Sequence, residues 1–389
     1  MKRLTRSVAF FVMAAFAAAS RGAEPPANSW TALTAKVVLP APWDKGLYVP
    51  VNAYGSITYC DHLGLMLNMD GYLLPGFIPG KSILNNYSCS LYGFDVDSRE
   101  LRLIKRSNWR TGARTDDPKF TSYPLPEYKG DPTPAPGHLY RGLTYLPDTK
   151  RAYLVGLCQA SNLSKHPEFD RLGAKDMQNF WSFDFDKNRW ELLPPPPFKF
   201  GFESTLAAVP GTGRIYLFSV LDAARYDLAQ GQWTKLGKPP TNLYACEALV
   251  DAKRKHVVFT RAVDWLPAKD KPAKYQQSQL LVFDADKETF ALVDGEGTIG
   301  GPVAHGGFAC VDHLDRYFLR AESGEYLFDP GTKRWSLLKI PALTTGQDGF
   351  RYSAWNYAGY DRKRKLIVLN HHLREWAILK LDASAPTSN

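Results

Sequence analysis

Residues 183–190 read FDFDKNRW, and this stretch contains the repeat from which the fold can be predicted. An aromatic residue is followed at once by Asp, then by a polar turn, and seven positions after the aromatic residue by a bulky apolar one. This spacing predicts a β-hairpin in which each strand points one large side chain to the same face. The pattern occurs five times, at Phe94-Asp95 with Leu101, Phe183-Asp184 with Trp190, Tyr226-Asp227 with Trp233, Phe283-Asp284 with Phe290, and Phe328-Asp329 with Trp335.

A second kind of hairpin precedes each of these units, with two apolar strands around a tight polar turn. Six copies are present, at residues 57–67, 143–155, 206–218, 247–259, 308–319 and 355–369. Two consecutive hairpins make a four-stranded meander, and meanders repeated around an axis make a propeller. The sequence therefore predicts an all-β fold, a six-bladed β-propeller of four-stranded antiparallel blades. The Pro-rich stretch 105–139 carries no copy of the pattern, so we interpret it as an inserted loop and not as a seventh blade.

The sixth unit lacks an outer strand, because only a short polar tail follows EWAILKLD at 375–382. Near the N-terminus, residues 28–42 read NSWTALTAKVVLPAP and are similar to the outer strands of the other units, with Trp30 in the place of Trp190 and Trp233. We expect this N-terminal strand to close the ring. The expected organisation is one propeller domain at 24–383, followed by a disordered tail at 384–389.

The repeat resembles the kelch-repeat propeller family, in which an aromatic residue and a Trp in the outer hairpin mark each blade. The resemblance runs from Trp30 to Asp382. It departs from the family after the second strand of each blade, where a Gly-Gly pair is usual and this chain has, for example, NMDG at 68–71 and VGLC at 155–158. Because kelch domains include protein-interaction modules, a copper oxidase and a sialic acid epimerase, the resemblance implies a fold and no single activity.

The N-terminus predicts export. Lys2, Arg3 and Arg6 precede an apolar run from Ser7 to Ala19, which matches a secretory signal peptide over residues 1–23, with cleavage near 19–23. An uncleaved membrane anchor is the alternative, but the run is shorter than the ~20 apolar residues that span a bilayer. We therefore expect a periplasmic or secreted protein with no transmembrane helix after cleavage.

Charge and cysteine content indicate which ligands and which covalent cross-links to expect. The formal net charge of +9 includes four basic residues before residue 24, so the mature chain has a mild excess, which does not favour nucleic-acid binding. Export permits disulfides, and Cys89 and Cys158, on neighbouring loops, are the favoured pair. We expect the other three cysteines to be small apolar core residues of inner strands: Cys60, Cys246 and Cys310.

The long connections all fall at one end of the propeller. With strands labelled a to d from the axis outward, the b–c stretches 69–90, 157–179 and 261–279 and the d–a stretch 105–139 share a rim, whereas the a–b and c–d turns at the other rim are short. We call these the long-loop rim and the short-turn rim. Long loops in a compact domain are usually functional, although they can also merely cap the blades.

Polar and aromatic residues begin the innermost strands at the long-loop rim, where six blades converge on the channel. Arg with Tyr and His fits a site that neutralises a carboxylate or sulfate while aromatic rings pack on sugar faces. We therefore expect an acidic saccharide or a partner protein as ligand. For any single residue, a solvated strand end is the alternative. The candidate ligand-binding residues are Tyr54, Arg141, Glu203, Tyr244, His305, Arg351 and Tyr352.

The alternative function is a carbohydrate-active enzyme of lyase or epimerase type, in which a Tyr or His base would act beside a neutralised carboxylate. The catalytic residues of such an enzyme cannot be assigned from the sequence. We expect no cofactor and no metal, because P-loop, nucleophile-elbow and HExxH motifs are missing and the adjacent His371 and His372 point to opposite faces of a strand. The protein is expected to be a monomer.

Basic tracts mark the short-turn rim, at Lys150-Arg151, 253–255 and 362–365. Turns need polar residues, and charged side chains at rims also block strand pairing between molecules. The functional alternative is electrostatic attachment to an anionic envelope or polysaccharide.

Overall fold

A computed structural model describes the structure of most of the β-strand repeats. The described residues are 25–38, 48–51, 56–69, 72–75, 90–106, 133–134, 139, 141–157, 178–200, 204–243, 246–260, 278–299, 307–321, 323–341, 343, 357–372 and 375–388. The expected signal peptide at 1–23 and the expected Cys89–Cys158 disulfide lie outside these ranges.

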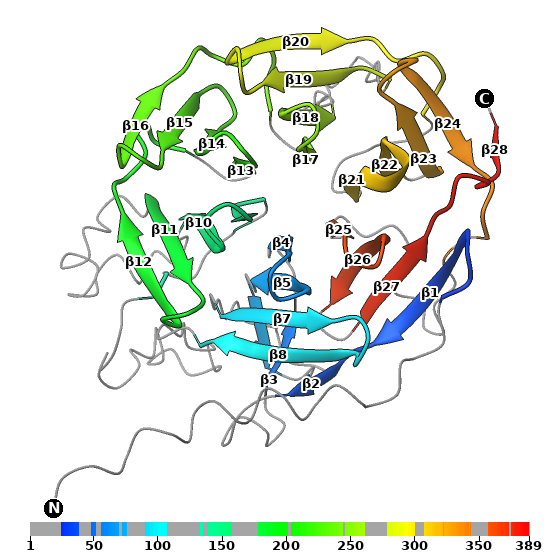
Figure 1. The fold of residues 1–389 in the computed structure, drawn as a ribbon, viewed down its shortest axis with the longest axis horizontal. Helices are drawn as coiled ribbons and strands as arrows, with labels where there is room; N and C mark the ends of the chain where they lie inside the picture. Colours follow the sequence, from blue (N-terminus) through cyan, green and yellow to red (C-terminus); the bar gives the residue numbers. More distant parts are fainter. Residues whose placement is uncertain are drawn as a thin grey trace, which may run out of the picture.

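Six antiparallel sheets surround a central axis, as Figure 1 shows in a view along it. This confirms the six-bladed propeller. Blade 1 contains β4 (Ser56–Cys60), β5 (Leu65–Met69), β7 (Leu91–Asp95) and β8 (Glu100–Lys105). Blade 2 contains β9 (Leu143–Leu146), β10 (Arg151–Leu157), β11 (Gln178–Asp184) and β12 (Arg189–Leu193). Blade 3 contains β13 (Thr205–Val209), β14 (Arg214–Phe218), β15 (Ala223–Asp227) and β16 (Gln232–Lys235).

The other three blades continue the ring in sequence order. Blade 4 contains β17 (Ala248–Asp251), β18 (His256–Thr260), β19 (Leu280–Asp284) and β20 (Thr289–Val293). Blade 5 contains β21 (Phe308–Val311), β22 (Arg316–Ala321), β23 (Gly324–Asp329) and β24 (Arg334–Leu338), with the 3-10 helix η3 (Asp312–Leu314) in its first turn. Blade 6 contains β25 (Tyr357–Asp361), β26 (Leu366–His372), β27 (Glu375–Lys380) and β1 (Ser29–Thr34).

The aromatic–Asp pattern forms the outer hairpins as predicted. In blade 2 Phe183 pairs with Trp190 across the strands, and each of the other four aromatic residues likewise pairs with the apolar residue seven positions later. The Asp carboxylate accepts hydrogen bonds from backbone N–H groups of the turn, as Asp227 does from Ala229 and Gln230, both at 3.0 Å. The motif therefore closes one turn in each of blades 1 to 5, and it places an aromatic pair in blades 2 to 5 and Phe94 opposite Leu101 in blade 1.

The hydrophobic core is divided among the junctions between blades. The largest clusters each join two neighbouring blades, for example blades 1 and 6, where Phe94 stacks on Trp376 at 4.1 Å between ring centroids. Corresponding clusters lie between blades 1 and 2, 2 and 3, 3 and 4, 4 and 5, and 5 and 6. Each blade is thus held on both of its faces by buried aromatic and aliphatic side chains.

The N-terminal strand closes the ring, which confirms the expectation. β1 pairs antiparallel with β27, and Trp30 lies opposite Leu379 in the same register that places Trp190 opposite Phe183. Figure 1 shows β1 beside β27 at the outer edge of blade 6. Asn28, just before β1, has a positive φ of 54°. Residues just before the outer strands of other blades also have a positive φ, for example Asn188 (φ 50°) before β12.

Two blades have a fifth strand that the sequence pattern does not predict. β2 (Lys36–Val38) pairs parallel with β8 in blade 1, and β28 (Thr387–Ser388) pairs antiparallel with β24 in blade 5. The tail expected to be disordered at 384–389 is therefore ordered at β28. Its order has a physical reason, since the Asp382 carboxylate accepts hydrogen bonds from Ser384 N–H and Oγ–H, and Lys339 N–H donates to the Pro386 carbonyl.

The b and c strands on either side of the long b–c connections end and begin where the sequence predicts, which confirms the positions of these connections. The segment between β5 and β7 contains β6 (Tyr72–Pro75), which pairs with β3 (Tyr48–Val51) in a separate two-stranded sheet. The expected burial holds for Cys60 and Cys246, whereas Cys310 is only partly buried. Among the described residues, no helix is long and apolar enough to cross a membrane.

Candidate functional site

The innermost strands of the six blades surround a cavity of about 160 Å³ in the central channel. All six run in the same direction, because each begins at the long-loop rim and ends in a short a–b turn. The cavity lining consequently has two ends of different chemistry. At the long-loop end it includes Ser56, Arg141, Thr205, Glu247 and Tyr357, and at the short-turn end it includes Tyr59, Tyr145, Cys310, Tyr360 and Arg362.

An ion pair lies at the long-loop end of the channel. Arg141 Nη1 donates to Glu247 Oε1 at 3.2 Å, and the side chains are only 8% and 6% exposed. Arg141 Nε also donates to Thr205 Oγ1 at 3.2 Å. These residues come from blades 2, 4 and 3, so side chains far apart in sequence meet beside the cavity.

The local backbone explains why Arg141 is held there. Gly142 N–H donates to the Leu139 carbonyl at 2.6 Å, and Val155 N–H donates to the Gly142 carbonyl at 2.9 Å. A Cβ at Gly142 would lie 2.4 Å from the Val155 carbonyl oxygen, a distance that only glycine avoids. The Arg141 carbonyl in turn accepts from Leu206 N–H, which ties the start of blade 2 to blade 3.

Of the candidate ligand-binding residues, the structure describes Arg141, and it lies beside the cavity as expected. The other six lie outside the described residues: Tyr54, Glu203, Tyr244, His305, Arg351 and Tyr352. Sequence reasoning did not single out Thr205 and Ser56, whose hydroxyls accept from Arg141 and from Leu143 N–H. Their position at the start of an apolar inner strand is the sequence feature that could have identified them as cavity-lining residues.

At the short-turn end, hydroxyl groups of tyrosines bond to histidines of the preceding blade. His62 Nδ1 lies 2.7 Å from Tyr145 Oη, and His313 Nδ1 lies 2.5 Å from Tyr360 Oη. His313 Nε2 also donates to the Leu381 carbonyl, so its Nδ1 accepts from the Tyr360 hydroxyl in the neutral ring. Burial raises the pKa values of the tyrosines that line this end, so they are neutral hydrogen-bonding groups at physiological pH: Tyr59, Tyr145 and Tyr360.

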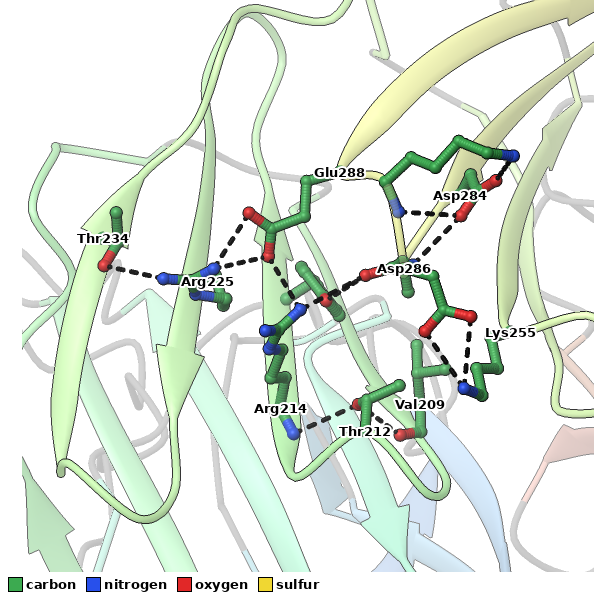
Figure 2. Close-up of polar contacts among 12 residues, drawn as sticks. Val209, Thr212, Arg214, Arg225, Thr234, Lys255, Asp284, Asp286 and Glu288 are labelled. Atoms are coloured by element: carbon green, nitrogen blue, oxygen red, sulfur yellow. Dashed lines mark hydrogen bonds and ion pairs between the residues drawn. The ribbon is translucent and has the colours of Figure 1, made fainter.

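The basic tracts of the short-turn rim are largely neutralised by carboxylates. Arg254 bonds to Asp251 and Asp315, Arg362 to Asp61 and Asp312, Arg364 to Asp97 and Asp361, and Arg151 to Asp184 and Glu191. Figure 2 shows the same arrangement between blades 3 and 4, where Arg214 and Arg225 both reach Glu288. This pairing favours a structural role for the rim over attachment to an anionic surface.

No group of three or more His, Cys, Asp or Glu side chains able to hold a metal ion occurs in the described ranges. Thiol chemistry is also restrained there, since burial raises the pKa of Cys60 to about 12. The side chains that converge on the cavity can therefore bind a ligand through hydrogen bonds and charge.

No protein-family model matches the chain, and no curated protein matches it. Among solved structures, the chain is similar to one titled "Structure of YjhT", with 15% sequence identity, a TM-score of 0.41, and coverage of 59% of this chain and 72% of that chain.

Proposed function

We propose that the protein is an extracytoplasmic propeller that binds an acidic saccharide at the long-loop end of its channel. The observation that carries this proposal is the meeting of Arg141, Glu247 and Thr205, from three blades, beside a cavity. Small-molecule sites are concave and combine apolar walls with a few convergent polar groups, and this end of the channel has that composition.

The polar groups suit a hydroxyl-rich ligand. A guanidinium supplies hydrogen-bond donors, a carboxylate supplies acceptors, and a hydroxyl supplies both, whereas every sugar hydroxyl both donates and accepts. The Glu247 carboxylate balances the Arg141 charge, so recognition of an acidic group depends on the additional cations expected at the same rim, Arg351 and His305. Tyr244 and Tyr352 are the proposed stacking residues.

The finer assignments belong to the same proposal. The aromatic–Asp and Trp pattern supports a divergent kelch-like propeller, and the N-terminal charge and apolar run support export to the periplasm or medium. We propose a monomer, with a partner protein on the long-loop face as the other ligand class to be screened. N-terminal sequencing of the exported protein tests the compartment, and a start within residues 20–24 is the expected result.

Binding without turnover is the favoured activity. A tyrosine base needs a lowered pKa, and burial raises the pKa values of the three tyrosines at the short-turn end, Tyr59, Tyr145 and Tyr360. The lyase or epimerase alternative therefore depends on a base at the long-loop end, either Tyr357, which lines the cavity, or one of Tyr244, Tyr352 and His305, which lie outside the described residues.

A glycan-array screen of the exported protein, followed by product analysis on every hit, tests the proposal. We expect binding of one or more glycans that carry a carboxylate or sulfate, with the glycan recovered unchanged. An unsaturated or epimerised product would replace the binding function by the enzymatic one. Failure to retain any acidic glycan, together with capture by neutral glycans alone, would contradict the proposal.

A further inference from the structure

The short-turn half of the channel is asymmetric. The next-to-last residue of each inner strand lines the cavity, and in blades 6, 1 and 2 this residue is a tyrosine. In blades 3, 4 and 5 the equivalent position carries a small side chain instead: Ala208, Val250 and Cys310. We call these three residues the small-residue arc.

Most of the polar groups facing this half of the channel are engaged with protein partners, but the buried Tyr59 hydroxyl has no hydrogen-bond partner among the described residues. Tyr145 and Tyr360 hydroxyls bond to His62 and His313, and the Arg362 guanidinium donates to Asp312 at 2.7 Å and to Asp61 at 3.2 Å. A ligand that replaced these contacts would leave buried polar groups unpaired, at a cost of roughly 1–3 kcal/mol each. The surface that remains for a ligand is the apolar side of the small-residue arc, together with the unpaired Tyr59 hydroxyl of blade 1.

The next layer toward the long-loop rim extends the apolar wall. In the same three blades, Leu206, Ala248 and Phe308 line the cavity two residues earlier on each strand. The cavity volume of about 160 Å³ limits an occupant to a group near the size of benzene, which a dry apolar cavity of roughly 150 Å³ is known to accept.

We propose that the small-residue arc is a binding subsite for a small apolar group, specifically an unsubstituted aromatic ring. This inference goes beyond saccharide binding, and its test uses no saccharide; the arc and the Arg141–Glu247 pair line different ends of the same cavity. Binding is favourable because it removes the apolar surface of both the ring and the arc from water.

Cys310 provides a reporter inside the subsite. Its thiol lines the cavity and is partly exposed, whereas Cys60 and Cys246 are buried. Methyl methanethiosulfonate converts a thiolate to a methyl disulfide and releases methanesulfinate, so peptide mass spectrometry can follow the labelling of Cys310 alone. Alkaline buffer is needed because burial, and then Asp312, raises the pKa of this thiol.

The experiment measures the labelling rate of Cys310 with and without benzene. At a benzene concentration of about four times its dissociation constant, the rate should fall about fivefold, because only the unoccupied fraction reacts. Val250→Phe fills the arc and should abolish the effect of benzene. If Val250→Phe does not fold, Ala248→Leu serves the same purpose. Leu221→Phe is the matched control, since Leu221 is 54% exposed and away from the cavity, and it should retain full protection.

A Cys310 labelling rate that does not change at any soluble benzene concentration would overturn the proposal. Equal protection in the wild-type protein and in a folded Val250→Phe or Ala248→Leu variant would also overturn it, because benzene would then act elsewhere on the molecule.

Discussion

Arg141, at the start of blade 2, depends on a partner at the start of blade 4, 106 residues later in the sequence. Its ion pair with Glu247 is almost completely removed from water, with exposed fractions of 8% and 6%. Two buried charges lose hydration, and their mutual attraction and their hydrogen bonds must offset that loss. The sequence places each residue at a strand start, but only the ring geometry makes them neighbours.

Replacing Arg141 by Ala should destabilise the fold by about 3–5 kcal/mol, because Glu247 would remain buried without its partner. The double substitution Arg141→Met with Glu247→Leu removes both charges and should recover most of that loss. Urea unfolding of the three proteins gives the comparison. Additive losses in the double variant would show that the two side chains are not energetically coupled.

The ion pairs of Asp315 should make the free energy of unfolding depend on pH in the acid range. Hydrogen bonds from Arg254, and then from Lys253, hold the pKa of its carboxyl well below the usual range. A lowered folded-state pKa means that the unfolded state binds the proton more readily, so this contribution is present above the unfolded pKa of about 3.9 and decreases below it.

The Asp315→Asn variant should therefore be less stable than the wild type at pH 7, and the difference should shrink as the pH falls below about 4. The carboxylate is partly exposed, with 35% of the side chain accessible, so the expected difference is reduced by solvent and salt. Urea midpoints across the pH range provide the measurement. A difference that grows toward acid pH would contradict the assignment.

At the scale of the element, the outer hairpins explain why the fold could be predicted. Each of the five copies places an aromatic residue opposite a large apolar one, such as Tyr226 opposite Trp233, and fixes its turn with an Asp carboxylate. Both features are local, so they leave a signal within eight consecutive residues. β2 and β28 left no such signal, because each is a short segment held by the edge of a strand far away in sequence.

Asp227→Ala should cost about 1–2 kcal/mol, because the N–H groups of Ala229 and Gln230 would lose their acceptor in the turn. Asp227→Asn keeps an acceptor oxygen and should cost less. Thermal unfolding of both variants distinguishes the turn contribution from a charge effect. An equal loss in the two variants would assign the effect to charge instead.

The candidate site was less predictable than the fold for a related reason. Convergence of strand starts on the channel follows from the propeller, which is why Arg141 was anticipated beside the cavity. Which partner it would meet depends on side-chain direction and on the approach of blades 3 and 4, as Thr205 and Glu247 show. The neutralisation of the basic short-turn rim likewise depends on carboxylates from neighbouring blades, such as Glu288 in Figure 2.

At the scale of the whole molecule, the two ends of the chain together close the ring. The N-terminal segment supplies β1 to blade 6 and β2 to blade 1, and the C-terminal segment supplies β27 to blade 6 and β28 to blade 5. Asn28 N–H donates to the Lys380 carbonyl, and the Asn28 side chain exchanges hydrogen bonds with Asp382. Blade 6 is thus completed by contacts between segments at opposite ends of the sequence.

Removal of residues 24–45 should abolish cooperative unfolding, because blade 6 would lose β1 and the buried contact of Trp30 with Phe318. Removal of residues 384–389 is the matched control, since it takes only the two-residue strand β28. Differential scanning calorimetry should show one sharp transition for the control. Unchanged melting of the N-terminal truncation would show that β1 is dispensable for closure.

The proposed binding end is tested most directly by calorimetric titration of an array-identified acidic glycan into three proteins: wild type, Arg351→Ala and Lys253→Ala. Lys253 lies at the opposite rim, where it pairs with Asp315 and its side chain is 70% exposed. We expect Arg351→Ala to lose about 1.5–3 kcal/mol of binding free energy, the range for hydrogen bonds to a charged group, and Lys253→Ala to bind like the wild type. Equal loss in both variants, or loss in Lys253→Ala alone, would contradict a ligand site at the long-loop end of the channel.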